Sequence, residues 1–276
     1  MISIFLMGGL GNQLFQIFTT IAYSLRHKKP FKFQYSETLK IGVERPTYWN
    51  SFLKRLKPFT TNDIIRLPLY RERGFQYVPI PIIQQNVMLH GYYQSYKYFE
   101  DQYENIIRMI QLRKQQNEVR EKYKEYFKED NTISMHFRLG DYKEKQEYHP
   151  VMKVEYYRKA LRTIIDKTTK QTWNILYFCQ EEDNVIVNKS IQILQNEFQY
   201  VTFVKVEDTM EDWEQMLAMS CCDHNIIANS SFSWWGAYFN ENPNKIICYP
   251  SIWFGPAMGH KIMDNLFKDN WVKIII

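Results

Sequence analysis

The sequence has few cysteines, and nothing in their spacing pairs them. Four occur in 276 residues, Cys179, Cys221, Cys222 and Cys248, with no Cys-x-x-Cys pair and no spacing typical of metal ligands. The adjacent Cys221 and Cys222 are poorly placed for a disulfide. We therefore interpret all four as reduced core thiols, which argues against a disulfide-stapled secreted domain and predicts a cytoplasmic protein.

Long apolar runs are absent as well. No stretch of about 18 apolar residues occurs, so the pattern predicts no membrane-spanning helix. The apolar segment 2–7 is too short for a signal peptide, lacks a basic start and is followed at once by a glycine-rich stretch. We therefore expect neither a signal peptide nor a membrane span.

Glycine and proline are scarce, and neither sign of charge dominates. Hydrophobic residues make up 45% of the chain and charged residues 24%, which is typical of a globular protein and excludes disorder, collagen and coiled coil. The 35 Lys and Arg exceed the 30 Asp and Glu by five, but the two signs are interspersed, as in 118–129. This pattern is typical of a solvated helix, so we predict no nucleic-acid partner, while the positive balance suits an anionic small substrate.

Several catalytic signatures are missing. Asp208 and Asp212 are too widely spaced for the Asp-x-Asp pair that holds Mg²⁺ on a nucleotide sugar, and the six histidines show no metal-ligand spacing. There is no Gly-x-Ser-x-Gly elbow and no Gly-Lys-Ser/Thr loop. We therefore predict no metal ion and no cofactor, with a cationic side chain and helix termini performing the work of a metal.

Aromatic residues, in contrast, are abundant at 16% of the chain. The 20 Tyr, 18 Phe and 7 Trp indicate either a Tyr-rich composition without functional meaning or an aromatic-lined groove for a sugar or a base. The second interpretation rests on the apolar faces of these rings and the polar edge of Tyr and Trp. Composition leaves both interpretations open.

Strand and helix patterns alternate along the chain. It opens with a strand at 2–7, a helix with an apolar stripe from Leu14 to Leu25, and a second strand at 31–35. Prolines interrupt 36–95, where we expect short elements before a strand at 87–89 and a helical region at 97–128. The later predicted strands are 132–137, 174–178, 200–206, 224–228 and 245–249, with helices at 154–166, 182–196, 211–221 and 232–240.

This alternation predicts an α/β fold. Strands separated by helices form parallel β-α-β units, and five such strands after residue 131 make a complete Rossmann-like half. A charged stretch near 128–131 marks the boundary. We therefore predict an N-terminal α/β domain (1–130) and a C-terminal Rossmann-like domain (131–276), two halves that would face a cleft.

The first motif that can carry chemistry is the run Gly8-Gly9-Leu10-Gly11-Asn12-Gln13, between the first strand and the first helix. Backbone N–H groups at a helix start favour an anion, and glycines let a ligand approach the backbone closely. A dinucleotide fingerprint would need a glycine where Leu14 stands. The alternative interpretation is a tight strand-to-helix turn without a ligand.

The second motif, His136-Phe137-Arg138-Leu139-Gly140-Asp141-Tyr142, closes the strand at 132–137. Ligands of open parallel sheets bind outside the carboxyl ends of the strands, which places His136, Arg138 and Asp141 at such a crevice. Arginine suits a bidentate contact to a diphosphate. The alternative is an Arg138–Asp141 ion pair in a turn, with His136 in the core.

The third motif, 228–237, follows the strand at 224–228 and opens the next helix. Asn229, Ser230 and Ser231 supply N-cap acceptors, and the same hydroxyl and N–H groups can hold phosphate oxygens. The paired Trp234 and Trp235 are more typical of a core than of a ligand site.

These motifs, in this order, resemble the α-1,2-fucosyltransferase family (glycosyltransferase family 11). The resemblance spans nearly the whole chain. Its longest piece, DWEQMLAMSCCDHNIIANSSFSWWGAYFN at 212–240, is specific. The other matching pieces are GGLGNQLFQ at 8–16, HGYYQSYKYFED at 90–101, HFRLGDY at 136–142, YHPVMKVEYYRKAL at 148–161, YPSIWF at 249–254 and the terminal Asn270-Trp271.

The resemblance implies a GT-B type fold and a metal-independent, inverting transfer of L-fucose from GDP-β-L-fucose to a glycan hydroxyl. The family's usual product is an α-1,2 linkage to galactose, so the implied partners are GDP-fucose and a galactose-containing acceptor. Acceptor recognition would fall to the N-terminal domain, and GDP-fucose binding to the C-terminal one.

The resemblance also implies roles for single residues. Arg138 would meet the donor diphosphate. Asp141, three residues further on, is our own second catalytic candidate, ranked first for a site role, with anchoring of Arg138 or of the loop as the alternative. Asn12 of the glycine-rich motif would face the donor, and His136 would contact its ribose or base. Ser230 to Phe232 would cradle the β-phosphate and flank the guanine. The full expected donor set is Gly11, Asn12, His136, Arg138, Asn229, Ser230, Ser231 and Phe232.

The general base is left open among several residues. Asp141, Glu144, Glu147 and His149 all follow closely on Arg138, and a single carboxylate at the cleft would suffice. Tyr92, Tyr93 and Gln94 are candidates for acceptor recognition, although a core position is an equal alternative for two of them.

The chain departs from the family pattern in two places. Leu139 stands where the family usually has a second Arg, and the family's Ser-Asp-Asp is replaced by Cys179-Gln180-Glu181-Glu182-Asp183. Two alternatives therefore stay open. One is a related nucleotide-sugar transferase with another acceptor or linkage, and the other is an inactive sugar-nucleotide-binding protein.

Overall fold

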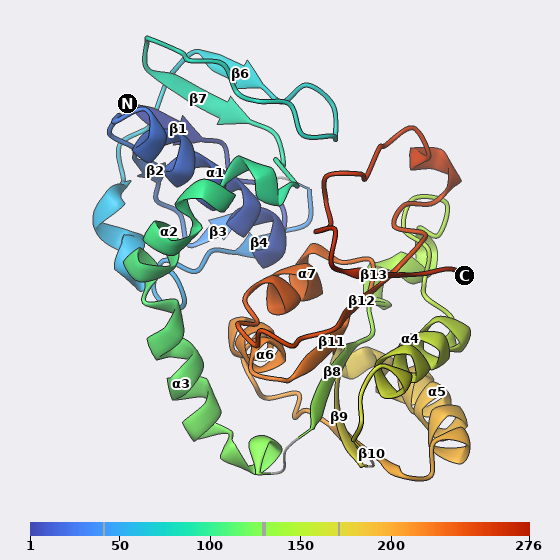
Figure 1. Cartoon of the computed structure of the whole chain (residues 1–276). Coiled ribbons are helices and arrows are strands. Elements are labelled where there is room, and N and C mark those ends of the chain that lie inside the picture. Colours follow the sequence, from blue (N-terminus) through green and yellow to red (C-terminus); the bar gives the residue numbers. More distant parts are fainter. Residues whose placement is uncertain (41, 129–130, 171) are drawn as a thin grey trace. The chain divides into compact units, whose positions relative to one another are not determined.

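The computed structural model describes residues 1–40, 42–128, 131–170 and 172–276, which group into two α/β units (Figure 1). The first unit contains Met1–Gln115 and Lys261–Lys268, and the second contains Gln116–His260 and Asp269–Ile276. Each unit has a parallel sheet of its own. The predicted α/β class, with two such halves in one chain, is therefore confirmed.

The sheet of the first unit has three strands. Strand β7 (Val87–His90) lies between β1 (Ile2–Ile4) and β6 (Leu69–Arg71), and all three run parallel. The predicted strand at 87–89 is confirmed, whereas β6 was not predicted, because this partly exposed edge strand has no apolar run. The other short elements described in this unit are β2 (Phe33–Gln34), β3 (Thr38–Leu39), β4 (Arg45–Pro46), β5 (Thr60–Thr61) and 3₁₀ helices at Lys54–Phe59, Tyr96–Tyr98 and Glu100–Gln102.

Helix α1 (Leu10–Arg26) forms the core of the first unit. Most of the predicted apolar stripe is buried, with Leu14, Phe18 and Ile21 fully inaccessible to solvent, whereas Leu25 in the last turn is 37% exposed. Most polar residues of this helix are buried as well, so it is covered on nearly all sides rather than on a single face; the exceptions are Asn12, which is half-buried, and Arg26, which is exposed. The helix ends at Arg26, before Lys28 turns into the left-handed region with φ 52°.

The predicted helical region at 97–128 is interrupted. Helix α2 (Tyr103–Ile110) ends at Gln111, which has a left-handed φ of 56°, and α3 (Leu112–Lys122) begins directly after it. Ile106, Ile107 and Ile110 are buried as their spacing predicts. A continuous helix would need α-helical backbone angles at Gln111. The segment is therefore helical as expected, but it forms two helices instead of one.

The second unit has a six-stranded parallel sheet in the order β10-β9-β8-β11-β12-β13. Renumbered within the unit, this order is 3-2-1-4-5-6, that of the Rossmann fold. The Rossmann-like half is thus confirmed, and β13 is a strand that the pattern did not reveal. The strands are β8 (Thr132–His136), β9 (Trp173–Phe178), β10 (Val201–Lys205), β11 (His224–Ile226), β12 (Ile247–Pro250) and β13 (Val272–Ile274).

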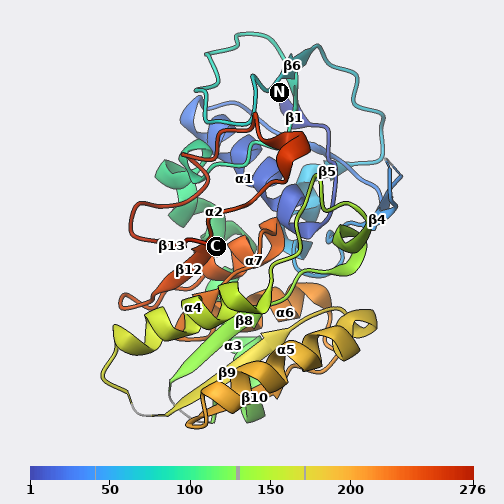
Figure 2. The same cartoon turned by 90° about the vertical axis from the view of Figure 1, so that its right-hand side faces the viewer.

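Helices cover both faces of this sheet. Both views show α4 and α5 on one face and α6 and α7 on the other (Figures 1 and 2). Two tyrosines of α4 tie this helix to the sheet, because the Tyr156 hydroxyl donates to the Ile227 carbonyl (2.5 Å) and the Tyr157 hydroxyl to the His136 carbonyl (3.1 Å). The helices are α4 (Val154–Asp166), α5 (Asn184–Glu197), α6 (Asp212–Ser220) and α7 (Ser231–Tyr238), close to their predicted bounds.

The grouping by contact differs from the predicted boundary at 130 in two segments. Residues 116–128 group with the second unit, since the Gln116 amide donates to the Ser220 hydroxyl (2.9 Å) and the Phe239 carbonyl (3.0 Å). Segment 261–268 groups with the first unit, where the Ser95 hydroxyl donates to the Asn265 carbonyl (2.6 Å). These side-chain hydrogen bonds lie within the units to which the two segments belong.

Two expectations from composition can be compared with the structure. All four cysteines are buried and none is in a disulfide. Among the described residues, no helix combines the length and the apolar character that crossing a bilayer requires.

Candidate functional site

Two loops meet the requirements for a ligand site in the second unit. The strand order reverses between β8 and β11, and crevices for ligands form outside the carboxyl ends of strands at such a point. The loop after β8 carries Arg138 and Asp141, and the loop after β11 leads through Asn229 and Ser230 into α7. The second and third motifs of the sequence are therefore neighbours in this unit.

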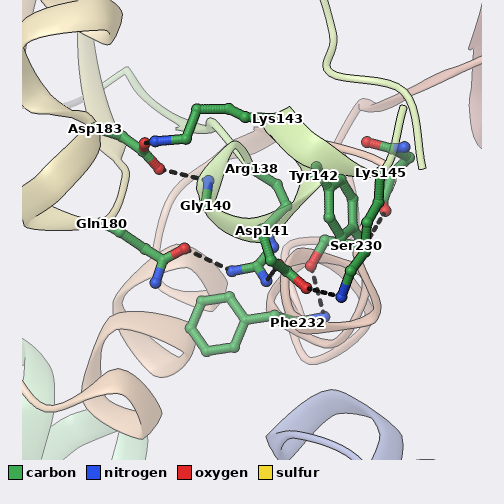
Figure 3. A network of polar contacts seen from close by, with 11 residues as sticks. Arg138, Gly140, Asp141, Tyr142, Lys143, Lys145, Gln180, Asp183, Ser230 and Phe232 are labelled. Atoms are coloured by element: carbon green, nitrogen blue, oxygen red, sulfur yellow. Dashed lines mark hydrogen bonds and ion pairs between the residues drawn. The ribbon is translucent and has the colours of Figure 1, made fainter. Parts of the chain in front are cut away.

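Arg138 is held in a defined orientation. Its Nη1 donates to Gln180 Oε1 (2.8 Å) and its Nη2 to Asp141 Oδ1 (2.5 Å), as Figure 3 shows. The guanidinium also lies over the ring of Tyr142, 5.0 Å from the centroid. The Arg138 side chain remains 21% exposed, so a preorganised cation is presented at the edge of the sheet.

Asp183, which sequence reasoning did not assign, anchors the loop that carries Arg138. This fully buried carboxylate accepts from the Gly140 backbone N–H (2.7 Å) and from Lys143 Nζ (2.7 Å) (Figure 3). Gly140 has a φ of 40°, and a Cβ there would lie 2.2 Å from Gln180 Oε1. The segment 179–183, where the chain departs from the family pattern, therefore supplies two polar supports for the loop.

His136 is buried in a neutral form. Burial, and secondly the nearby Arg138, lowers the pKa of the imidazole from 6.5 to about 3. Its ring lies 5.5 Å from that of Phe232, and its Nδ1 is buried without a hydrogen-bond partner. A neutral imidazole with an unsatisfied nitrogen is suited to a hydrogen bond with a ligand, and it cannot pair with a phosphate as a cation at neutral pH.

Asn229 and Ser230 shape the start of α7. Asn229 Nδ2 donates to the carbonyls of Pro150 (2.9 Å) and Trp253 (3.1 Å), while its buried Oδ1 accepts no hydrogen bond. Ser230 is the N-cap, and its hydroxyl accepts from the Phe232 N–H (3.3 Å). Ser231 and Phe232 follow in the first turn, half-buried. The predicted N-cap is confirmed, and the Asn229 oxygen adds an unsatisfied acceptor beside it.

The rest of α7 is packing. Trp234 and Trp235 are fully buried, as the core interpretation predicts. A Cβ on Gly236 would lie 2.8 Å from Met219 Cβ, so glycine is needed where α7 crosses α6. Leu139, the other departure from the family pattern, is also buried, in the hydrophobic core of this unit.

The residues proposed as general base after Arg138 are either exposed at the surface or already engaged in contacts with neighbouring side chains. The side chains of Glu144 and Glu147 are exposed. The His149 ring stacks on Tyr142 with centroids 4.7 Å apart, and the Tyr142 hydroxyl donates to the Asn229 carbonyl (3.3 Å). Asp141 is occupied by Arg138, with Lys145 Nζ at 3.8 Å from its second oxygen.

The glycine-rich motif forms the β1–α1 turn of the first unit. Gly8 has a φ of 77°, and a Cβ on it would lie 2.5 Å from Asn12 Nδ2, whereas a Cβ on Gly9 would meet nothing within 4 Å. Gln13 Nε2 donates to the Gly8 carbonyl (2.9 Å). Gln16 pairs with the backbone of Met7, because its Oε1 accepts from the Met7 N–H (2.9 Å) and its Nε2 donates to the Met7 carbonyl (3.1 Å). Gly11 is buried in the first turn of α1.

The remaining predicted residues of the first unit lie after β7. Gln94 Nε2 donates to Asn12 Oδ1 (2.7 Å), which brings the glycine-rich motif and the HGYYQ segment together. Tyr93 is buried and Tyr92 is 38% exposed, so the core alternative holds for Tyr93. In the described parts of the chain, no group of three or more His, Cys, Asp or Glu side chains is arranged to hold a metal.

Comparison with known proteins identifies the class. The family model Glycosyl transferase family 11 matches residues 1–275. The chain is similar to the O-antigen biosynthesis glycosyltransferase WbnK of Escherichia coli, with 35% identity over 150 residues that cover 52% of this chain and only 45% of that protein. It is also 26% identical to an alpha-1,2-colitosyltransferase of Escherichia coli, over 90% of this chain and 91% of the relative.

Among solved structures, a glycosyl transferase family 9 protein of Veillonella parvula aligns with 99% of this chain and 86% of its own, with a TM-score of 0.47 and 11% identity. The protein is a glycosyltransferase. It belongs to glycosyl transferase family 11 over essentially its whole length.

Proposed function

We propose that this glycosyltransferase moves L-fucose from GDP-β-L-fucose to a glycan hydroxyl with inversion, forming an α-1,2 linkage to a galactose-containing acceptor without a metal ion. The observation that carries the proposal is the position of Arg138. The Arg138 guanidinium, held by hydrogen bonds to Gln180 and Asp141, follows β8 at the point where the strand order of the Rossmann-like sheet reverses. The N-cap of α7 follows the neighbouring strand, β11. Nucleoside diphosphates bind in such crevices.

In this proposal Arg138 stabilises the leaving GDP. As the bond between the sugar and the β-phosphate breaks, negative charge builds on the phosphate oxygens. A guanidinium already oriented by Gln180 and Asp141 can stabilise that charge without reorganising. Backbone N–H groups at residues 230–232 would add dipoles of the right sign.

The unsatisfied atoms of the second unit would recognise the nucleoside. His136 Nδ1 and Asn229 Oδ1 are buried and lack partners, and Phe232 offers a ring face beside His136. Because an unmade hydrogen bond at a buried atom is costly, a ligand that completes these bonds gains specificity. We assign Asp141 the role of orienting Arg138. Gly11 and Asn12 of the first unit stay proposed donor-facing residues, as the family resemblance implies, and Gln94 a proposed contributor to acceptor recognition.

A second donor is favoured by one specific finding. The relative that aligns with 90% of this chain is named an alpha-1,2-colitosyltransferase. A colitosyl donor is therefore the alternative to a fucosyl donor, with the same diphosphate contacts and a changed sugar pocket.

The test is a direct transfer assay. The purified protein is incubated with GDP-fucose or GDP-colitose and acceptors terminated by galactose, rhamnose or fucose, with and without EDTA, and product linkage is determined by NMR. We expect a fucosylated galactose product whose yield EDTA does not change. Preference for GDP-colitose would select the second donor. Dependence on added manganese would contradict the role given to Arg138, and the absence of transfer or hydrolysis with either donor would contradict the proposal.

A further inference from the structure

The two units differ in net charge. By sequence, the first unit carries 18 Lys and Arg against 8 Asp and Glu, whereas the second carries 17 Lys and Arg against 22 Asp and Glu. The net charge of +5 for the whole chain is therefore the sum of a strongly basic unit and an acidic one. Such an asymmetry points to an anionic partner of the basic unit.

The carboxyl edge of the sheet in the first unit carries a buried carboxyl group. Glu72 follows β6 directly, its Oε2 accepts from the Tyr92 N–H (2.8 Å), and its Oε1 is buried without a hydrogen bond. A Cβ on Gly91 would lie 2.3 Å from Glu72 Cβ, so only glycine leaves room for this side chain. The Asn12–Gln94 pair at the same edge is neutral. These groups suit a neutral ligand better than an anionic one.

The amino edge of the same sheet has the opposite character. Strands β1, β7 and β6 run parallel, β2 pairs in parallel with β5, and Phe31 bridges to Ile2 in the same direction. Because parallel strands enter a sheet from one side, the segments that lead into them meet at one edge. These segments include 25–32 before β2, 54–59 before β5 and 82–86 before β7. Together the three contain seven Lys and Arg and no Asp or Glu.

Contacts within the unit show that the three segments are neighbours. Lys29 Nζ donates to the carbonyls of Ile83 and Gln84, the second at 2.8 Å. The rings of Phe31 and Phe59 stack with their centroids 4.8 Å apart. The segment before β2 therefore contacts both of the others, and the three form one continuous part of the surface, which we call the amino-edge patch.

Most cations of the amino-edge patch have no acidic partner. Four exposed side chains form no ion pair with any described residue, namely Lys28, Lys32, Lys54 and Arg55. Lys57 has a neutral partner, since its Nζ donates to Asn50 Oδ1 (2.6 Å). Arg26, in contrast, is paired with Asp101 (2.5 Å). The patch therefore keeps positive charge that no carboxylate of the unit compensates, and this charge attracts an anionic surface.

Exposed apolar side chains lie among these cations. Leu25 is 37% exposed, Phe59 37% and Ile82 66%, one from each of the three segments. A soluble polyanion would meet the cations but would leave the Ile82 side chain in water. A membrane surface offers a partner to both kinds of side chain, because apolar groups enter the boundary of the acyl chains while cations meet the anionic headgroups.

We propose that the amino-edge patch binds the surface of a membrane that contains anionic lipids. The four cations without an acidic partner meet the lipid phosphates, and the three exposed apolar side chains enter the headgroup region. The inference goes beyond the proposed function and does not depend on it, because a peripheral contact of this kind needs neither donor nor acceptor.

The experiment measures sedimentation of the full chain with vesicles of phosphatidylcholine alone and of phosphatidylcholine with phosphatidylglycerol. We expect binding to the anionic vesicles only, weakened by salt. Lys32→Gln combined with Arg55→Gln should raise the Kd for anionic vesicles by about 30-fold, because two cations are removed from the lipid surface. The control combines Lys189→Gln with Lys273→Gln, which removes the same charge from exposed positions of the second unit and should leave this Kd unchanged.

A further variant, Ile82→Ser, distinguishes a membrane from a soluble polyanion. Because this side chain is largely exposed, the variant should keep the fold, which circular dichroism checks. It should weaken binding to anionic vesicles by about 5- to 10-fold, since an apolar contact with the lipid is lost. Equal binding to both kinds of vesicle, binding to neither, or an equal loss in the control pair would overturn the proposal. An unchanged Kd in Ile82→Ser, or tighter binding to a DNA oligonucleotide than to anionic vesicles, would overturn it as well. Absence of sugar transfer would instead contradict the proposed function.

Discussion

The two units arrange polar groups differently at the carboxyl edges of their sheets. In the second unit the charges are paired, with Arg138 on Asp141 and Lys143 on the buried Asp183. In the first unit Glu72 keeps an unsatisfied oxygen, and the Asn12–Gln94 pair beside the turn is neutral. Paired charges hold a fixed cation for an anion, whereas a half-satisfied carboxyl group is able to exchange a proton. The difference supports a division into donor and acceptor functions.

In their backbones, by contrast, the two edges are alike. Each has a glycine with positive φ in the loop after a strand, Gly8 in the first unit and Gly140 in the second. In each, a polar side chain occupies the place of the missing Cβ, Asn12 Nδ2 at 2.5 Å and Gln180 Oε1 at 2.2 Å. The same local solution therefore serves two loops of different chemistry.

The largest expected effect comes from removing the cation of the second unit. Arg138→Ala should lower kcat by about 10²–10³-fold or more, because one preorganised group that stabilises developing charge is lost. Arg138→Lys should recover little of the rate, since the fork that meets two phosphate oxygens is absent. Steady-state kinetics, with circular dichroism to confirm folding, measure both. Near-normal rates in Arg138→Ala would contradict a catalytic role for Arg138. The contrast between a charged sheet edge in the second unit and a neutral one in the first would then have no functional meaning.

Alanine substitutions at Gly8 and Gly9 of the first unit distinguish a packing role of the β1–α1 turn from a ligand-binding role. Gly8→Ala should destabilise the fold by about 1–3 kcal/mol, because positive φ strains alanine and its Cβ meets Asn12. Gly9→Ala should leave the free energy of unfolding nearly unchanged, as nothing lies within 4 Å of its Cβ. Urea unfolding measures both. A stable Gly9→Ala with reduced donor or acceptor binding would show that a ligand approaches the turn.

The buried support of the Arg138 loop should matter for both stability and donor binding. Asp183→Asn should reduce the free energy of unfolding by about 1–3 kcal/mol, because the buried charge that accepts from Gly140 and Lys143 is lost. The Kd for GDP should rise as the loop loosens. Lys143→Gln keeps the Gly140 contact but removes the cation paired with the buried carboxylate, so it measures the contribution of the ion pair separately and should leave the Kd for GDP less affected than Asp183→Asn does. Equal effects in the two variants would mean that the ion pair, rather than the loop contact, is what Asp183 contributes.

The smallest effect is a pair of opposite pH dependences. Below pH 6.5 the unfolded chain protonates His136 while the folded chain, with its pKa near 3, does not, so stability falls as the pH falls. Glu72 acts in the other direction, because the folded chain keeps its proton between pH 4.5 and 7, so its contribution falls as the pH rises.

Unfolding midpoints measured between pH 5 and 8 can test this pair of pH dependences. Within its pH window, each group changes the free energy of unfolding by at most about 1.4 kcal/mol per pH unit. The two contributions offset each other where their windows overlap, so His136→Asn should leave stability falling as the pH rises from 5 to 7, and Glu72→Gln should leave it rising as the pH rises from 5 to 6.5. Unchanged slopes in both variants would mean that the two edges do not differ in how they bury titratable groups.

Much of the second unit could be predicted because its elements follow strong local patterns. The strands at 132–137 and 174–178 are apolar runs of ordinary length, and the stripe through Tyr157, Leu161 and Ile164 marks a helix face. The strand β6 and the break at Gln111 were missed, because an exposed edge strand and a left-handed residue leave no periodic signal. Asp183 and Glu72 were missed for a related reason. Asp183 lies where the chain departs from the family pattern, Glu72 lies outside the matching motifs, and both accept from backbone N–H groups distant in the sequence.

Reading the chain alone was sufficient for the α/β class, the alternation of strands and helices and the family resemblance, because these depend on local periodicity and on motifs whose residues are close in sequence. The tertiary structure decided which loops become neighbours, that Leu139 points into the core, and that Gly91 makes room for Glu72. Burial decided the protonation of His136 and Glu72. Desolvation depends on what surrounds a group in space, and no spacing along the chain encodes it directly.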